Sequence, residues 1–180
     1  MTITTVQSTT DETRSNTKSP LLDIRDLKVH FPVTEGFILQ RQVGVIKAVD
    51  GVNLSVNPGE TLGLVGESGS GKTTIGRAIL KLENATEGQI LLNGEDITKS
   101  TGNRLRDFRR RLGMVFQDPF GSLNPRMSAG NLVGEPLKIH GLTTTKSDYK
   151  RRVAELLKIV GLNSMMAGRY PHEFSGGQRQ

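Results

Sequence analysis

The 180-residue sequence predicts an α/β fold organised around a phosphate-binding loop, with an antiparallel β subdomain before the loop and an inserted α-helical subdomain after it. The stretch from Gly66 to Thr73 matches G-x-x-x-x-G-K-[ST] at every fixed position. An apolar run (61–65) precedes it and a run with helical spacing (73–82) follows it, which is the strand, loop and helix setting that the pattern requires. After residue 119 the apolar residues change from strand spacing to helical spacing.

The residues before the loop predict two strands. Residues 22–31 alternate between apolar and polar, apart from one phase slip near Asp26, and predict an amphipathic strand that Pro32 ends. Residues 33–44 are expected to form a loop or hairpin. Residues 45–56 then return to the sheet.

Turn residues and apolar spacing define the middle of the chain. A turn is expected at Asn57-Pro58-Gly59, and residues 61–65 are expected to form a short buried parallel strand. The helix after the loop presents an apolar stripe that would pack on the sheet, made of Ile75, Ala78, Ile79 and Leu82.

The next segment predicts a strand, a hairpin and an arginine-rich helix. Residues 90–92 form the predicted strand, and Asn93-Gly94 is a strong hairpin signal. Leu105, Phe108 and Leu112 make a helical stripe among five arginines, which favours a solvated helix face over a specific anion or nucleic-acid site. A further buried strand is expected at 114–117.

The segment 119–180 is expected to be mostly helical up to a final glycine-rich motif. Its clearest helix has the apolar stripe Tyr149, Val153, Leu156, Leu157 and Val160. Thr145 or Ser147 can cap the start of this helix, and Gly161 closes it.

Composition limits the remaining possibilities. Residues 1–20 hold seven Thr and three Ser and too few apolar side chains to offset chain entropy, so we expect a disordered tail there, followed by the β subdomain and loop core over 21–118. No stretch resembles a secretory signal or a membrane span. Without cysteine, disulfides and thiolate metal sites are excluded, and the net charge of +6 suits either a polyphosphate or nucleic acid.

The loop carries the clearest chemistry. Its glycines let backbone N–H groups turn inward, and the helix that follows adds unpaired N–H groups and the positive end of its dipole. Lys72 would place a cation between the β- and γ-phosphates, and the Thr73 hydroxyl would ligate Mg²⁺. The candidate nucleotide-binding residues here are Gly66, Glu67, Ser68, Gly69, Ser70, Gly71, Lys72, Thr73 and Thr74.

Three motifs in order give a resemblance to a known family. The phosphate loop, Val115-Phe116-Gln117 and Phe174-Ser175-Gly176-Gly177-Gln178 together resemble the ATP-binding subunit of ABC transporters, over residues 21–180. The sequences of residues 117–127 and 170–180 are similar to those of the ATPases of the oligopeptide/dipeptide importer family. The resemblance implies a P-loop NTPase with a RecA-like core, here incomplete, that binds ATP and Mg²⁺ and acts as an ATPase.

The resemblance also assigns roles to single residues. Phe31 matches the aromatic residue that stacks on adenine, and Gln117 matches the residue that contacts Mg²⁺ and the attacking water. The signature residues Ser175, Gly176, Gly177 and Gln178 would complete the loop of another subunit. A Ser-Gly-Gly turn that opens a helix can itself bind an anion, because it offers a hydroxyl and free N–H groups.

Partners and location follow from the same resemblance. We expect a second, homologous ATPase subunit in a head-to-tail dimer, two membrane permeases that contact the region of Pro119 to Leu142, and an indirect link to an extracytoplasmic solute-binding protein. The expected location is the cytoplasmic face of the inner membrane, as a peripheral subunit without nucleic acid. The expected function is import of oligopeptides, dipeptides or similar small solutes.

The family's later motifs do not occur in these 180 residues. An apolar strand ending in Asp-Glu and a later histidine are missing, and His30, His140 and His172 all precede the signature, so each is expected to have a surface or packing role. We therefore expect a fragment that ends inside the domain and binds ATP at best. Two alternatives remain: a nucleic-acid-associated ABC ATPase, and a non-catalytic nucleotide-binding fragment.

Overall fold

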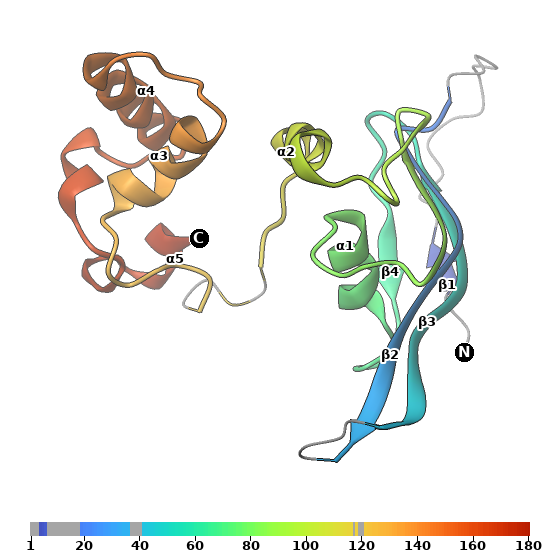
Figure 1. Ribbon diagram of the computed structural model, residues 1–180. Coiled ribbons are helices and arrows are strands. Elements are labelled where there is room, and N and C mark those ends of the chain that lie inside the picture. The colour runs from blue at the N-terminus through green and yellow to red at the C-terminus, as the bar shows by residue number, and fades with distance from the viewer. Residues whose placement is uncertain (1–3, 7–18, 37–40, 117, 119–120) are drawn as a thin grey trace. The chain divides into compact units, whose positions relative to one another are not determined.

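The computed structural model describes residues 4–6, 19–36, 41–116, 118 and 121–180 (Figure 1). The chain divides into two compact units, Met1–Gly113 and Met114–Gln180, and each is described by itself. The predicted boundary at residues 118 and 119 lies a few residues further along the chain.

The first unit is built on a four-stranded antiparallel sheet with the strand order β3-β2-β5-β6. The helices α1 and α2 lie on one side of this sheet (Figure 1). The bounds of these elements are β2 Leu22–Glu35, β3 Arg41–Val56, β5 Glu87–Leu92, β6 Glu95–Asp96, α1 Lys72–Ile79 and α2 Gly102–Arg111. The α/β class predicted from the sequence is confirmed.

A β-bulge in β2 explains the phase slip near Asp26. The register with β3 shifts between Ile24 and Leu27, and Asp26 has a φ of 46°. The extra residue moves the next apolar side chains back to the face that holds Ile24, so that Leu27 and Val29 are both buried. The slip seen in the sequence is therefore a structural feature of the strand.

Pro32 does not end β2, contrary to the sequence-based prediction. The strand continues to Glu35, and Pro32 lies opposite Val45 of β3. On its other side β2 pairs with β5 only as far as Lys28. Pro32 therefore lies where β2 has one neighbour, and a residue without an N–H is tolerated at such an edge.

The strand before the phosphate loop also differs from the prediction. β4 Gly63–Val65 pairs antiparallel with β1 Thr4–Val6, whereas a buried parallel strand was expected. Val65 remains 62% exposed, because in the described part of the chain only β1 pairs with β4. The pairing also corrects the expectation of disorder for residues 4–6, since the open edge of β4 gives them backbone partners.

The core of the first unit lies between the sheet and the two helices. It consists of Ile24, Leu27, Val29, Val49, Ile75, Ala78, Ile90, Leu92, Ile97 and Phe108. Leu82 was expected in this core but is 51% exposed, because α1 ends at Ile79 and Lys81 has a φ of 56°. Such a φ takes the chain out of the helix before Leu82.

Both predicted turns are present. Glu60 N donates to Asn57 O at 3.1 Å around Gly59, which has a φ of 80°. Asn93 and Gly94 have φ values of 52° and 79°, as a tight two-residue hairpin between β5 and β6 requires.

All the helices and strands assigned in the described part of the second unit are helices. Leu137, Val153 and Leu157 form its core. The cap predicted for α4 is confirmed at Thr145, whose Oγ1 accepts from Asp148 N at 3.1 Å. The elements are α3 Ala129–Ile139, α4 Lys146–Ile159, η1 Ser164–Gly168, η2 Pro171–Glu173 and α5 Gly176–Arg179.

Candidate functional site

The phosphate loop runs from the end of β4 into the first turn of α1. Gly69 and Gly71 have φ values of 81° and 87°, which side chains with a Cβ rarely adopt. A Cβ on Gly71 would also clash with the carbonyl oxygen of Ala48, so the loop packs backbone to backbone against β3. Ser70 N donates to Glu67 O at 3.1 Å and closes a turn within the loop.

Lys72 holds its ammonium group over this loop. Its Nζ donates to the carbonyl oxygens of Gly66 and Glu67, both at 2.7 Å, and to Ser70 Oγ at 3.0 Å. An ammonium has three protons, so each has an oxygen acceptor here. Phosphate oxygens are acceptors of the same kind with more negative charge, and the position of Lys72 therefore fits a phosphate-binding role.

The N-terminus of α1 faces the same loop. Its N-cap is Gly71, no side chain caps it, and the first turn has no acidic residue. Thr73 is exposed and Thr74 is half-buried in this turn. An uncapped helix start offers N–H groups and positive potential to an anion, and Thr73 and Thr74 lie in this first turn.

Phe31 lies on the same face of the sheet as the start of α1. It is two residues beyond the buried Val29 on β2, and it pairs with Ile46, which is on β3. A Cβ on Gly71 would lie 3.4 Å from Val49 Cγ2, and Val49 is the partner of Val29. Phe31 is therefore two residues further along β2, beyond a register shift with β3 between Val29 and His30, and it is 36% exposed.

The predicted strand at 114–117 is absent from the described residues. Met114, Val115 and Phe116 have no strand assignment, and Val115 is 96% exposed. No described strand pairs with this segment, and Phe116 is 48% exposed while Met114 is half-buried. Gln117, which the sequence predicts to contact Mg²⁺ and the attacking water, lies outside the described residues.

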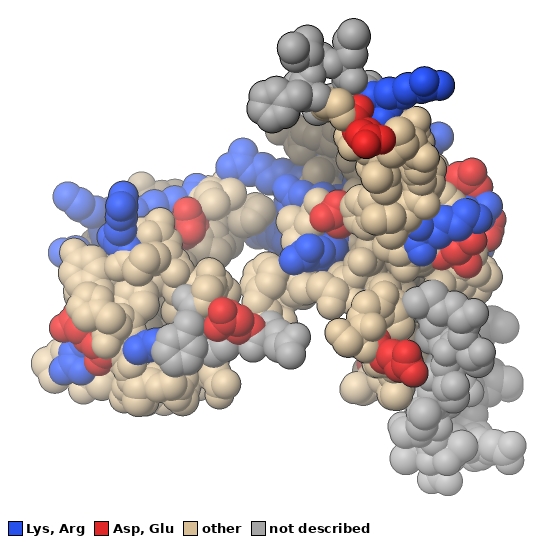
Figure 2. Space-filling view, turned by 90° about the horizontal axis from the view of Figure 1, so that it is seen from below, with Lys and Arg blue, Asp and Glu red and all other residues tan. Residues whose placement is uncertain are grey.

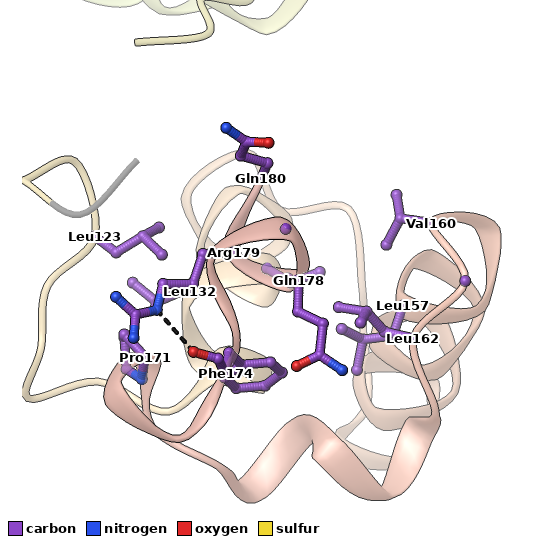
Figure 3. Close-up of a pocket in the computed structure, with 14 residues that line it drawn as sticks. Leu123, Leu132, Leu157, Val160, Leu162, Pro171, Phe174, Gln178, Arg179 and Gln180 are labelled. Carbon is purple, nitrogen blue, oxygen red and sulfur yellow. Dashed lines mark hydrogen bonds between the residues drawn. The ribbon is translucent and has the colours of Figure 1, made fainter. Parts of the chain in front are cut away.

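The signature residues form a capped turn in the second unit. Ser175 Oγ accepts from Gln178 N at 3.4 Å, and Gln178 Oε1 accepts from Ser175 N at 3.0 Å, which together make a capping box. Gly176 and Gly177 are exposed. Phe174 is buried beside this turn, and Arg179 Nε donates to its carbonyl oxygen at 3.1 Å (Figure 3).

An apolar pocket of about 410 Å³ adjoins the signature turn (Figure 3). All of its lining residues belong to the second unit. Its lining residues are Leu123, Ala129, Leu132, Val133, Leu157, Val160, Gly161, Leu162, Pro171, Phe174, Gly177, Gln178, Arg179 and Gln180.

The three histidines each have a defined local position in the structure. His30 Nε2 lies 2.9 Å from Asp50 Oδ1, and Lys47 Nζ lies 3.0 Å from the other oxygen of that carboxylate. These bonds lower the pKa of Asp50, with the Lys47 bond as the larger cause and the His30 bond next. His172 stacks on Tyr170, and His140 is the C-cap residue of α3.

Several arginines of α2 have partners that sequence spacing could not reveal. Arg104 and Arg111 pair with Glu95 at 3.0 and 3.9 Å, and both guanidinium groups lie over the ring of Phe108. Arg109 donates to backbone carbonyls at the end of α1. Figure 2 shows acidic side chains among the basic ones over the first unit. Glu95 and the backbone carbonyls lie 9 to 29 residues away in sequence, so local patterns contain no signal for these partners. Only the contacts with Phe108 fall within one turn of the helix.

None of the helices that the structure describes combines the length and the apolar composition needed to span a bilayer.

Comparison with known proteins gives concordant matches. Residues 49–180 match the family model described as ABC transporter. The chain is 52% identical over 161 residues to the oligopeptide transport ATP-binding protein AppF of Bacillus subtilis strain 168, covering 89% of this chain and 48% of that protein. It is 55% identical over 139 residues to the dipeptide transport ATP-binding protein DppF of Lactococcus lactis subsp. cremoris, covering 76% of this chain and 45% of that protein. The chain thus spans about half the length of these relatives.

A solved structure gives the same fold. The dimeric post-hydrolysis state of the ATP-binding cassette MJ0796 bound to ADP and Pi superposes with a TM-score of 0.70 at 27% sequence identity. The match covers 88% of this chain and 65% of that one.

Proposed function

The chain belongs to the ABC transporter family, and from this membership we propose that its loop from Gly66 to Thr73 binds the phosphates of ATP. The observation that carries the proposal is the position of Lys72, whose ammonium lies over the loop and donates to three loop oxygens. The uncapped N-terminus of α1 adds unpaired amides at the same place. Family members use ATP, and the related MJ0796 cassette was solved with ADP and Pi.

We assign Mg²⁺ to the Thr73 hydroxyl. Among the described residues no three His, Cys, Asp or Glu side chains gather as metal ligands, so the donor set that fits is a hydroxyl together with phosphate oxygens. Mg²⁺ suits such a set because it usually keeps several waters and few protein ligands. When bound, it would neutralise charge on the β- and γ-phosphates. Gln117, which is outside the described residues, is proposed as an auxiliary ligand.

Phe31 is proposed to stack on the adenine ring. It lies on the sheet face on which Gly71 packs, and its ring is partly exposed. A base extending from phosphates bound at the loop could reach this face, where an aromatic ring offers stacking.

The signature turn is proposed to complete the loop of a second cassette. Both Gly176 and Gly177 are exposed, so a phosphate could approach the turn closely. The related MJ0796 cassette is dimeric. A head-to-tail pair would place Ser175 of each chain over the phosphates bound to the other chain, so that ATP joins the two.

The transport role is proposed from the relatives. The two curated proteins are named for oligopeptide and dipeptide transport. We propose that the full protein hydrolyses ATP to drive uptake of such solutes. It would act as a peripheral subunit on the cytoplasmic face of the membrane, below two permeases supplied by a solute-binding protein. The permease contact is proposed for the described residues of the segment 119–142.

ATP binding by the full chain tests the central proposal. Isothermal titration calorimetry with Mg²⁺ and ATP should show binding that Lys72→Ala weakens by roughly tenfold or more, because a charge-assisted bond to phosphate is lost. Lys47→Ala is the matched control, since Lys47 pairs with Asp50 and is outside the loop. Equal affinity for both variants would refute the assignment of the loop.

Binding of two different ligands tests the adenine assignment. Phe31→Ala should weaken ATP binding by roughly tenfold but leave tripolyphosphate binding unchanged, because only stacking is lost. Equal losses for the two ligands would point to a folding defect.

Analytical ultracentrifugation tests the signature assignment. Ser175→Arg should prevent ATP-dependent association, because a large side chain would fill the space needed by the partner's phosphates. ATP binding by the separate chain should persist. Association that is unaffected by Ser175→Arg would contradict the head-to-tail proposal.

A further inference from the structure

A polar pocket lies in the first unit, and its lining includes no residue of the phosphate loop. It has a volume of about 390 Å³, which falls in the size range of small-ligand sites. Its residues come from β5, β6, the connection between β6 and α2, and the start of α2, and none of them belongs to the proposed nucleotide site. They are Gly88, Gln89, Asp96, Thr98, Lys99, Ser100 and Arg104.

The N-terminus of α2 lies at this pocket. The helix has ten residues, and its N-cap Thr101 makes no side-chain hydrogen bond to the first turn. The first turn has no acidic residue either, so no carboxylate neutralises the helix dipole there. The amides of Gly102 and Asn103 are among those that an α-helix cannot satisfy internally.

A buried hydroxyl at the same place has no partner. Ser100 is 5% exposed, and its Oγ makes no hydrogen bond to any described residue. An unpaired buried polar group is costly, so native structures rarely keep one without a water or a ligand. Ser100 lines the pocket immediately before α2, and a rotation of its side chain would bring the buried hydroxyl to an oxygen acceptor there.

The charges around the pocket favour an anion. Lys99 and Arg104 are cationic, whereas the only carboxylate that lines the pocket, Asp96, is already engaged. Its Oδ1 accepts from Thr98 N at 2.8 Å and its Oδ2 lies 3.5 Å from Gln89 Nε2.

The titration of that carboxylate is consistent with positive surroundings. The pKa of Asp96 lies below its usual value, chiefly through hydrogen bonding to Thr98 and to a smaller extent through the charges of Lys99 and Arg104. Arg104 also pairs with Glu95 at 3.0 Å, which fixes its guanidinium beside the pocket.

We propose that this pocket binds a phosphate group, either as free inorganic phosphate or as the head group of an anionic lipid. The Ser100 hydroxyl would donate one hydrogen bond and the first amides of α2 would donate others. Lys99 and Arg104 would supply the charge. The site is independent of the phosphate loop, so the chain would hold phosphate at two places in its first unit.

Amide-resolved NMR on the full ¹⁵N-labelled chain separates the two places. Titration with inorganic phosphate should shift the amides of Gly102 and Asn103, and these shifts should persist in Lys72→Ala, which weakens the loop site. Vesicles with and without phosphatidic acid distinguish the sources: shifts with phosphate identify the free ion, and shifts only with phosphatidic acid identify a lipid head group. If neither inorganic phosphate nor phosphatidic acid shifts these amides, the proposal is overturned.

Ser100→Ala tests the role of the hydroxyl, with Ser55→Ala as the control because Ser55 is an exposed serine of β3. Affinity at the α2 amides should fall about tenfold in Ser100→Ala and stay constant in Ser55→Ala. Without phosphate, Ser100→Ala should melt at the same or a higher temperature, since it removes an unpaired buried group. Should Ser100→Ala fail to fold, Lys99→Gln at the exposed rim should still weaken binding. Unchanged affinity in Ser100→Ala or in Lys99→Gln would show that the pocket does not bind phosphate as proposed.

Discussion

The guanidinium of Arg109 caps the end of another helix: its Nη2 lies 2.9 Å from the carbonyl oxygen of Lys81. Its Nε also donates to the carbonyl oxygen of Leu80, the C-cap residue of α1, at 3.3 Å. The last carbonyls of a helix lack internal partners, and a cation there also suits the helix dipole. Arg109 therefore ties α2 to the helix that begins at the phosphate loop.

Replacing this arginine should loosen the end of α1. Arg109→Met is expected to lower the free energy of unfolding by about 0.5–1.5 kcal/mol, because it removes two hydrogen bonds to backbone carbonyls. Arg110→Met on the same exposed helix should change it by less than about 0.5 kcal/mol. Urea unfolding followed by circular dichroism gives both values, and equal losses would show that the contact is energetically neutral.

Two glycines of one segment should respond in opposite directions to alanine. Gly71→Ala is expected to cost at least about 1–2 kcal/mol, because φ is 87° and the new Cβ would clash with Ala48 O. Gly76→Ala should stabilise the protein by about 0.5–1 kcal/mol, because Gly76 lies inside α1 and, apart from the neighbouring backbone of that helix, no atom lies within 4 Å of the added carbon. Thermal unfolding measures both, and a stable Gly71→Ala would contradict the close approach of the loop to β3.

The helical unit offers a test at its cap. Thr145→Ala should destabilise α4 by about 1 kcal/mol, because Asp148 N loses its acceptor. Ser147→Ala, two residues later and inside the helix, should be neutral or slightly stabilising. Helix content during thermal unfolding distinguishes the two; similar effects would mean that Thr145 is not the cap.

The ion cluster around Asp50 predicts a pH dependence. The pKa of Asp50 is lowered, first by Lys47 and then by His30, so this group binds protons less readily when folded. The contribution of Asp50 to the stability of the folded protein is therefore present above the unfolded pKa of about 3.9. It is lost as the pH falls through the lower folded pKa. The difference in stability between the wild type and Asp50→Asn should thus disappear in acid.

Lys47→Met provides the comparison for that experiment. It removes the larger cause of the shift, so the pKa of Asp50 should move back toward its ordinary value. Carboxyl ¹³C NMR measures the pKa directly, and an unchanged value in Lys47→Met would assign the shift to His30 instead.

Local sequence predicted the parts of the fold that local geometry decides. The phase slip at Asp26, the two glycine turns, the Thr145 cap and the loop and helix around Lys72 each depend on a few adjacent residues. The residue types that form turns and helix caps are specific enough for these features to be predicted directly from the sequence.

The errors concern features that depend on distant partners. Whether Pro32 ends a strand depends on how far β5 extends beside it, and whether Val65 is buried depends on which strands pair with β4. Apolar spacing placed Val115 in a strand, but no described strand pairs with it. The caps and ion pairs of the α2 arginines lie beyond any local window for the same reason.

The bulge at Asp26 links two positions that are far apart in sequence. Gly88 of β5 has a φ of 90°, and a Cβ there would clash with the carbonyl oxygens of Arg25 and Asp26. No side chain larger than hydrogen fits at position 88 while β2 keeps its extra residue. The two positions should therefore be inherited together: a lineage that loses the bulge becomes free to replace Gly88, and one that keeps it does not.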